Sequence, residues 1–389
     1  MRNQKFRSDP ASDAEAQTVK KSNGGITDSS SAPFNRAWIL LVSRAHVQFV
    51  FPIFKSSTCM SRLLRTRPIL KQLLNPAQLR PFHITTTKMT TGLFNYIDPT
   101  SSLDDNGNRV KPWAKVDVDQ TSFERSQHKR DVVDIRNAAG TTAFGVDLSG
   151  FDVFKSPAKE TEFTDDAAVR NGYYGEVEAL LKERIPEIKK VVIFDHTIRR
   201  REKSSPRQPV QQVHVDQTPG AAEARVRRHT DPSETEELLK GRYQIINVWR
   251  PIGHPATDFP LAVVDYRTTK PEDMIKVDLL YPKREDNDDD DRGKEVLPDA
   301  STLRSTEGYQ VKGETYSVAP NDGHKFYYAK DMTPEEVMLI KCFDSKSEVH
   351  EGGQHGLAGY TPHTAFVDPA TPADAKGRQS IEVRCLVFY

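Results

Sequence analysis

The C-terminal stretch of the chain, residues 378–388, alternates between polar and apolar side chains. Aliphatic residues and a cysteine occupy the odd positions from 381 to 387, and the intervening polar positions are Arg378, Ser380, Glu382 and Arg384. Successive side chains of a strand point to opposite faces, so this alternation is typical of a half-buried strand. The chain must therefore form a sheet that keeps two arginines, a serine and a glutamate on the face opposite the apolar one.

Much of the remaining chain also favours strands over helices. We expect strands at residues 132–136, 145–148, 190–194, 211–216, 243–249, 261–267, 325–329 and 336–343. The stretches 325–329 and 336–343 are expected to form a pair joined by residues 330–335, and a strand that begins at His363 is expected to pair antiparallel with 378–388. With about eight strand candidates in its C-terminal half, the sequence predicts a mainly β protein with a barrel or sandwich core.

Two segments carry helix signals instead. Residues 164–184 begin with Thr164 as the expected N-cap and continue with two aspartates in the first turn, where acidic side chains favour the helix dipole. Residues 231–241 form a second, shorter helix, with Asp231 or Ser233 as its cap. These helices are expected to flank the β core.

The strand-like stretch 211–216 contains side chains of the kind that bind metals. Because residues two apart on a strand point to the same face, His214 and Asp216 project side by side. A third ligand must come from a distant strand, and His363 is the best candidate. Two histidines and one carboxylate on one face suit Fe(II) and leave positions open for a co-substrate and dioxygen, although the ligand types do not exclude zinc.

Other side chains compete for these roles. His350 and His355 lie in a glycine-rich loop, whereas His363 begins a strand, so we prefer His363 as the third ligand. Arg378 is expected to bind a carboxylate in bidentate fashion beside the metal, with the hydroxyl of Ser380 adding a hydrogen bond. Arg384 lies further along the same face and is better placed for a structural pair with a carboxylate.

Four stretches carry a resemblance to a known family. They are GRYQIINVWRPI (241–252), YYAKDMTPEEV (327–337), HTAF (363–366) and RQSIEVR (378–384). Over about residues 92–389 the chain resembles the fungal hydroxylase/desaturase family of 2-oxoglutarate/Fe(II) oxygenases, which includes AsaB-like enzymes, gibberellin desaturase-like enzymes and a cephem-methoxylase component.

The resemblance implies a double-stranded β-helix, or jelly roll, with a few flanking helices. It also implies Fe(II) held by His214, Asp216 and His363, and 2-oxoglutarate held at its C5 carboxylate by Arg378 and Ser380. The expected activity is hydroxylation or desaturation of a small secondary metabolite with dioxygen.

Two other functions stay open from the sequence. The cephem branch of the family suggests a methyltransferase or methoxylation component, but no glycine-rich turn after a strand supports an adenosyl pocket. A β-barrel binding protein without chemistry is the other alternative, and the presence of His214, Asp216, His363 and Arg378 argues against it.

The balance of charges and the positions of the cysteines limit which partners and which cellular compartment the sequence predicts. The chain has 389 residues with 55 basic and 55 acidic side chains, which argues against a nucleic-acid partner because such proteins normally have a basic excess. The three cysteines, at 59, 342 and 385, have no metal-ligand spacing. The last two fall in expected strands and are interpreted as buried thiols of a protein in a reducing compartment.

The N-terminal residues 1–88 are interpreted as a disordered leader, and residues 89–389 as the oxygenase domain, whose first part, 92–115, is expected to be loop-rich. Residues 60–88 have arginines and leucines at helical spacing and no acidic residue. They resemble a mitochondrial transit peptide, and the alternative is a translated upstream region with the true start at Met60 or Met89. We accordingly expect a cytoplasmic protein, or a mitochondrial one if this segment acts as a transit peptide.

Two further stretches have simple interpretations. The apolar stretch 38–54 contains Arg44 and His46 and is short for a membrane span, so no span is expected. The acidic stretch 283–301 lacks the glycine and terminal glutamate of a calcium loop and is interpreted as a solvated insertion.

Overall fold

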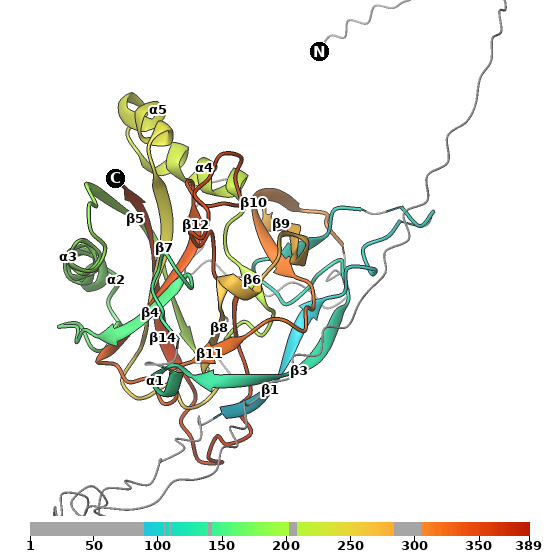
Figure 1. Ribbon diagram of the computed structural model, residues 1–389, viewed down its shortest axis with the longest axis horizontal. Coiled ribbons are helices and arrows are strands. Elements are labelled where there is room, and N and C mark those ends of the chain that lie inside the picture. Colours follow the sequence, from blue (N-terminus) through green and yellow to red (C-terminus); the bar gives the residue numbers. More distant parts are fainter. Residues whose placement is uncertain (1–88, 105, 109, 139–141, 202–207, 284–304) are drawn as a thin grey trace, which may run out of the picture. The chain divides into compact units, whose positions relative to one another are not determined.

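The computed structural model describes residues 89–104, 106–108, 110–138, 142–201, 208–283 and 305–389. The expectations for the leader 1–88 and for most of the acidic stretch 283–301 fall outside these residues. Within the described residues, a nine-stranded and a five-stranded sheet face each other (Figure 1). No helix in this part of the chain is long and apolar enough to cross a lipid bilayer.

The larger sheet has the strand order β1-β3-β11-β8-β13-β6-β10-β9-β2. Its strands are β1 (Met89–Ile97), β2 (Trp113–Lys115), β3 (Arg125–Asp134), β6 (His214–Val215), β8 (Leu261–Val264), β9 (Met274–Pro282), β10 (Tyr309–Val318), β11 (Phe326–Tyr328) and β13 (His363–Ala365). Neighbouring strands are antiparallel, except that β11 runs parallel to β3 and β2 to β9. The short strands β6 and β13 lie next to each other in this sheet.

The smaller sheet has the order β4-β12-β7-β14-β5, with every neighbouring pair antiparallel. Its strands are β4 (Phe151–Lys155), β5 (Lys190–Arg200), β7 (Tyr243–Pro251), β12 (Glu336–Asp344) and β14 (Gln379–Phe388). Strands β7 and β12 are buried at every position, because one face of this sheet meets the larger sheet and the other is covered by helices.

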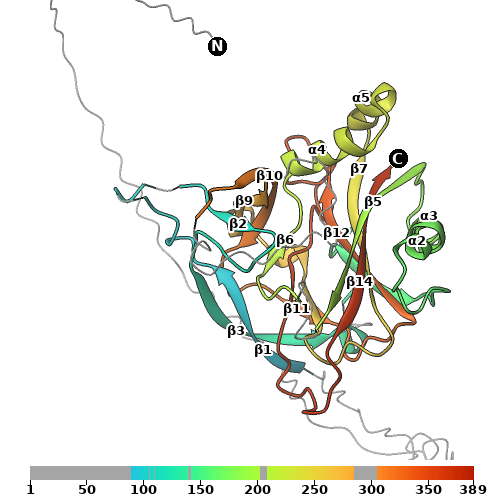
Figure 2. The ribbon, with the colours of Figure 1, turned by 180° about the vertical axis from the view of Figure 1, so that it is seen from behind.

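The helices lie outside the two sheets (Figures 1 and 2). They are α1 (Ile135–Ala138), α2 (Asp166–Ala168), the π-helical turn η2 (Val169–Tyr173), α3 (Tyr174–Arg184), α4 (Pro219–His229) and α5 (Pro232–Lys240), with 3-10 turns η3 (Tyr266–Thr268) and η4 (Pro271–Asp273). Val177 and Leu181 of α3 pack against the outward side chains of β7 and β14, including Val248 and Val383. A separate core between the sheets contains Ile245 and Leu386 from the smaller sheet and Val263 from the larger one.

The structure therefore has the predicted mainly β, jelly-roll architecture with a few flanking helices, and both predicted helices are present. Residues 164–184 contain α2, η2 and α3 in succession. The N-cap is Asp165 rather than Thr164, because its carboxylate accepts a hydrogen bond from the backbone N–H of Ala167 at 2.9 Å. The expected cap of the second helix, Asp231, accepts from the backbone of Ser233.

Some local predictions were wrong. Residues 92–115 are loop-rich as expected between β1 and β2, but they also contain most of β1 and all of β2, and β1 pairs with β3 along its whole length. Residues 145–148 form a turn rather than a strand, since the backbone N–H groups of Leu148 and Ser149 donate to the carbonyl of Gly145. Helix α4 was not predicted, although Thr218 caps it and Pro219 begins it, which is a recognised start signal.

Both specific strand pairings were also wrong. Strands β11 and β12 follow each other in the chain but belong to different sheets, and so do β13 and β14. Each connection crosses from the larger sheet to the smaller one, as expected in a jelly roll. The crossing matters for function, because it places His363 and the polar face of β14 on opposite walls of one cavity.

Candidate active site

His214, Asp216 and His363 form a compact cluster on the inner side of the larger sheet. His214 in β6 and His363 in β13 are directly opposite residues of an antiparallel pair, and Asp216 directly follows β6 in the sequence. One ligand atom from each of the three lies within 4.8 Å of the other two. The structure thus brings together all three residues that the sequence predicted as metal ligands.

The two imidazoles are oriented by backbone carbonyls. Nδ1 of His214 lies 2.7 Å from the carbonyl oxygen of Gln212, and Nδ1 of His363 lies 3.0 Å from that of Thr361. A carbonyl only accepts, so each Nδ1 is the donor to it, and Nε2 of each ring is the nitrogen that faces Asp216 and can bind a metal once it is deprotonated. This arrangement of a histidine bound through one nitrogen and oriented through the other is usual at metal sites.

The carboxylate of Asp216 divides its two oxygens between different partners. Oδ1 lies 3.3 Å from Nε2 of His214 and 3.7 Å from Nε2 of His363. Oδ2 accepts a hydrogen bond from Nδ2 of Asn247 at 2.7 Å and lies 3.5 Å from Nε of Arg384. Burial raises the pKa of Asp216, but the hydrogen bond from His214 and the charge of Arg384 outweigh it and lower the pKa well below the usual range.

The pKa values of the two histidines shift in opposite directions. Burial lowers the pKa of His214, but the hydrogen bond and charge of Asp216 reverse this, so its pKa is raised. Burial and repulsion from His214 lower the pKa of His363. The cluster therefore holds one carboxylate and at least one neutral imidazole, which are ligand forms that a divalent metal requires.

Arg378 faces the same cavity from the smaller sheet, although it is only 3% exposed. Its Nη1 donates to the carbonyl of Phe259 at 2.7 Å, whereas its buried Nε has no hydrogen-bond partner within the described residues. Burial and repulsion from Arg199 lower the pKa of Arg378 to about 9. A buried guanidinium held by one corner, with the Nε side unpaired, is suited to bind a carboxylate.

The cavity around these groups has a polar and a less polar wall. The smaller sheet contributes mainly polar side chains, and the larger sheet and its connections contribute the metal cluster and small or apolar side chains. The lining residues are Thr197, Arg199, Val210, His214, Asp216, Trp249, Leu261, His363, Thr364, Ala365, Arg378, Ser380, Glu382 and Arg384. Ser380, predicted to assist Arg378, thus lies in the same cavity.

The structure also shows where the alternative site residues lie, namely Arg384, His350 and His355. Arg384 forms the structural ion pairs that were predicted, at 3.0 Å to Asp195 and 2.8 Å to Glu382. His355 pairs with Glu348 in an exposed loop, and the ring of His350 packs against a phenylalanine. Neither of these histidines belongs to the metal cluster.

Sequence reasoning missed several contacts at the site. The alternation of β7 had placed Asn247 and Trp249 on one face as possible pocket residues, but nothing indicated that Asn247 binds Asp216. The guanidinium of Arg378 lies 5.6 Å from the ring centroid of Trp249, a distance that allows a cation–π contact. The contact between Arg378 and the carbonyl of Phe259 uses a backbone atom, so no pattern of side chains in the sequence could have revealed it.

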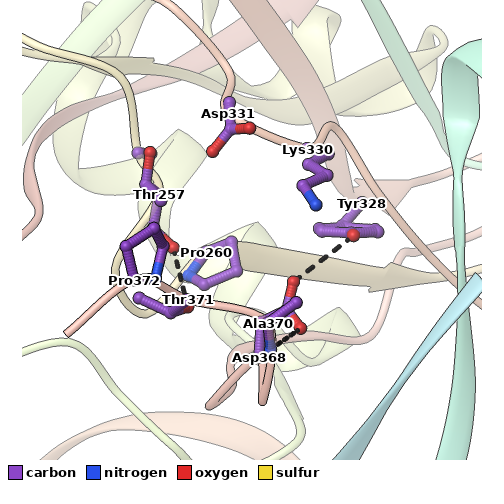
Figure 3. Close-up of a pocket in the computed structure, with 10 residues that line it drawn as sticks. Thr257, Pro260, Tyr328, Lys330, Asp331, Asp368, Ala370, Thr371 and Pro372 are labelled. Carbon is purple, nitrogen blue, oxygen red and sulfur yellow. Dashed lines mark hydrogen bonds between the residues drawn. The ribbon is translucent and has the colours of Figure 1, made fainter. Parts of the chain in front are cut away.

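A second hollow is lined by residues of the segments 256–260, 328–331 and 368–372 (Figure 3). It encloses about 110 Å³, compared with about 40 Å³ for the cavity at the metal cluster. Its most buried carboxylate, Asp368, accepts hydrogen bonds from Thr90, from Tyr328 and from the backbone of Ala370. Because its buried polar atoms are already bonded and no histidine lines it, size does not make this hollow the functional site.

Comparison with known proteins identifies the family. A family model described as "Oxidoreductase/YMDC permease-like domain" matches residues 94–388. The hydroxylase/desaturase efuI of Hormonema carpetanum is 32% identical over 274 residues, which cover 66% of this chain and 82% of that protein. The chain belongs to the hydroxylase/desaturase family.

Two further comparisons relate this family to iron enzymes. The Fe(II)/2-oxoglutarate-dependent dioxygenase nvfI of Aspergillus novofumigatus is 31% identical, over 72% of this chain and 89% of that protein. The solved structure of the iron and alpha-ketoglutarate-dependent endoperoxidase NvfI has a TM-score of 0.61 and 25% identity, and the match covers 77% of this chain and 98% of that chain.

The comparisons confirm the family, the jelly-roll fold and the class of enzyme that the sequence predicted. The chain is an oxidoreductase of the hydroxylase/desaturase family, whose relatives include Fe(II)/2-oxoglutarate dioxygenases. They favour neither the methyltransferase nor the binding protein. The roles of individual residues rest on the geometry of the cavity.

Proposed function

We propose that His214, Asp216 and His363 hold Fe(II), that Arg378 and Ser380 hold the C5 carboxylate of 2-oxoglutarate, and that the enzyme hydroxylates or desaturates a small secondary metabolite using dioxygen. The observation that carries the proposal is the shared cavity: a buried guanidinium with an unpaired Nε faces the same space as a His-Asp-His cluster. A structural zinc site would have no use for such a guanidinium.

The donor atoms fit the proposed cofactors. Two imidazole nitrogens and one carboxylate oxygen on one side of a metal are the usual protein ligands of non-haem Fe(II) oxygenases and leave the opposite side open. A guanidinium can donate two parallel hydrogen bonds to a carboxylate, and the Nε of Arg378 has no partner among the described residues. Arg199, directly opposite Ser380 in the neighbouring strand β5, adds positive charge that favours a dianionic co-substrate.

The bound metal and co-substrate supply the oxidising power, and the side chains of the chain supply position. The carbonyls of Gln212 and Thr361 orient the two imidazoles, and Asp216 would supply the carboxylate ligand of the metal. Arg378, anchored by the carbonyl of Phe259, would hold the carboxylate of the co-substrate in the cavity. The cavity lies between the two sheets, so the reacting groups are shielded from bulk water.

The partners follow from the same features. We propose a small organic substrate and dioxygen as partners, without nucleic acid, in line with the balanced charge of the chain. Trp249, Leu261 and Ala365 provide apolar contact area in the cavity. These side chains suit a substrate whose reactive carbon carries few polar groups.

The test is an anaerobic titration of the full chain with Fe(II) and then 2-oxoglutarate. A weak visible charge-transfer band should appear, and admission of air should produce succinate. His214→Ala should abolish the band, while His355→Ala, which removes a histidine of the exposed loop, should keep it. Retention of the band in His214→Ala would reject the ligand assignment. Failure of the unaltered chain to give either band or succinate would reject the proposed function.

A further inference from the structure

The two oxygens of Asp216 are held in unequal surroundings. Oδ1 points between the two imidazoles, at 3.3 and 3.7 Å from their Nε2 atoms. Oδ2 is turned toward the smaller sheet, where the amide of Asn247 donates to it at 2.7 Å. A carboxylate that met a metal symmetrically would direct both oxygens to the same side, whereas the hydrogen bond from Asn247 directs Oδ2 away from the imidazoles.

Asn247 is fixed in the orientation that this hydrogen bond needs. It is fully buried in β7, and its cross-strand partner in β14 is Arg384. Since a carboxylate only accepts hydrogen bonds, Nδ2 of Asn247 must be the atom that faces Asp216. The Oδ1 of the same amide is buried without a partner within the described residues. An unpaired buried acceptor costs stability. This cost indicates that an amide is kept at position 247 because its Nδ2 donor is needed.

Arg384 is a second group of the smaller sheet that lies next to Oδ2 of Asp216. Its Nη1 donates to Asp195 and to Thr197, each at 3.0 Å, and its Nη2 lies 2.8 Å from Glu382. These contacts hold the guanidinium in place, with Nε at 3.5 Å from Oδ2 of Asp216. Arg384 therefore adds positive charge next to Oδ2, while Asn247 makes the short hydrogen bond.

We infer that Asn247, backed by Arg384, is a positioning residue that restricts Asp216 to coordination through one oxygen. This inference rests on the proposed function. A six-coordinate metal with three single-atom protein ligands keeps three positions, enough for a chelating 2-oxo acid and dioxygen. If both oxygens of Asp216 coordinated, only two positions would be left, and the chelate and dioxygen would compete for them.

The inference can be tested with Asn247→Leu, which removes the donor at nearly constant size. The matched control is Asn321→Leu, which removes another amide-to-carboxylate contact, from Asn321 to Asp273, outside the cavity. Water-proton relaxation of the Mn(II)-loaded protein counts metal-bound water without any turnover. We expect the count to fall from about three to about two in Asn247→Leu and to stay unchanged in the control.

A second readout is the affinity for 2-oxoglutarate, measured anaerobically through the charge-transfer band of the Fe(II)-loaded protein. Its Kd should rise about tenfold or more in Asn247→Leu, with the Fe(II) affinity nearly kept. An unchanged water count together with an unchanged Kd would overturn the inference. If Asn247→Leu does not fold, Asn247→Ser removes the amide without added bulk and carries the same expectation. Failure of the proposed function is recognised separately, because the unaltered protein would then show no metal-dependent binding of 2-oxoglutarate.

Discussion

His214 and His363 are cross-strand partners in the middle of the nine-stranded sheet, with their ring centroids 4.5 Å apart and the ring planes inclined by 52°. Neither residue is near the other in the sequence. Their pairing depends on β6 and β13, two of the shortest strands in the described sheets. The geometry of the metal cluster is thus set by the register of two very short strands.

Removal of the distal histidine should disable metal binding. In His363→Ala we expect the affinity for Fe(II) to fall by at least about 100-fold, because one of three ligands is lost. An anaerobic titration monitored by equilibrium dialysis measures it. His355→Ala serves as the control with unchanged affinity. Near-normal Fe(II) binding by His363→Ala would show that the third ligand lies elsewhere.

Substitution of Arg378 should separate co-substrate binding from metal binding. Arg378→Ala should weaken 2-oxoglutarate binding by about 30-fold, since charge-assisted hydrogen bonds contribute about 2 kcal/mol. Arg378→Lys should recover part of this, because lysine keeps the charge but not the bidentate geometry. Calorimetric titration of the Fe(II)-loaded protein under nitrogen measures both variants.

The Fe(II) affinity of both Arg378 variants should stay close to that of the unaltered protein. Arg267→Lys is the control, because Arg267 pairs with Asp265 outside the cavity. Equal 2-oxoglutarate affinity in Arg378→Ala and the control would exclude Arg378 as the carboxylate-binding residue.

Gly150 should influence the metal cluster from a distance. Its φ is +90°, and an added Cβ would lie 2.3 Å from Oγ1 of Thr361, whose carbonyl orients His363. Gly150→Ala should destabilise the protein by about 1 kcal/mol or more through backbone strain and steric overlap. It should also weaken Fe(II) binding, because Thr361 must shift.

Gly352→Ala is the matched control for Gly150→Ala. Gly352 has a φ of +72° but open space around its added Cβ, so it should lose stability without loss of metal affinity. Thermal unfolding and Fe(II) titration of both variants distinguish general strain from the specific contact. Identical Fe(II) affinity in the two variants would contradict the proposed coupling to His363.

A buried ion network away from the site should dominate the stability of the smaller sheet. Lys341 is fully buried and lies 2.6 Å from Asp147 and 2.8 Å from Asp344. Lys341→Met should cost about 1.5–3 kcal/mol at pH 7, because both carboxylates lose a buried charge-assisted donor and keep Arg242 as a cationic partner. Lys182→Met, which breaks an exposed pair with Glu178, should change the free energy of unfolding by less than about 0.5 kcal/mol.

The effect of Lys341→Met should depend on pH in a defined direction. Burial raises the pKa of Asp344, but Arg242 and Lys341 outweigh it and lower the pKa. A carboxylate whose pKa is lowered by folding stabilises the protein above its unfolded pKa, and this contribution is lost as the pH falls through the lower, folded value. The difference between Lys341→Met and the unaltered protein should therefore shrink below about pH 4. Urea unfolding at pH 7 and below pH 4 measures it, and a pH-independent difference would contradict the ionic origin.

Local sequence patterns predicted the faces of the strands well. The alternation in residues 378–388 placed Ser380, Glu382 and Arg384 on one face, and in the structure all three line the cavity. The same rule placed His214 and Asp216 on one side of their strand. These predictions succeed because the direction of a side chain along a strand depends only on the backbone of that strand.

The tertiary structure alone decided which strands became neighbours. Strand β14 was expected beside β13, but it lies between β7 and β5 in the other sheet. Alternation fixes the face of a strand but carries little information about its partner, since many apolar faces are equally good matches locally. The partner is selected by burial and packing of the whole domain.

The sequence by itself determined the kinds of chemical groups and the faces on which they lie: two imidazoles, a carboxylate and an arginine. Only the tertiary structure decided that Asn247 restrains Asp216 and that the carbonyl of Phe259 anchors Arg378. Both contacts join distant parts of the chain, and one uses a backbone atom that every residue carries. Such contacts form only when the two sheets pack against each other, so they cannot be predicted from the sequence pattern of a single strand.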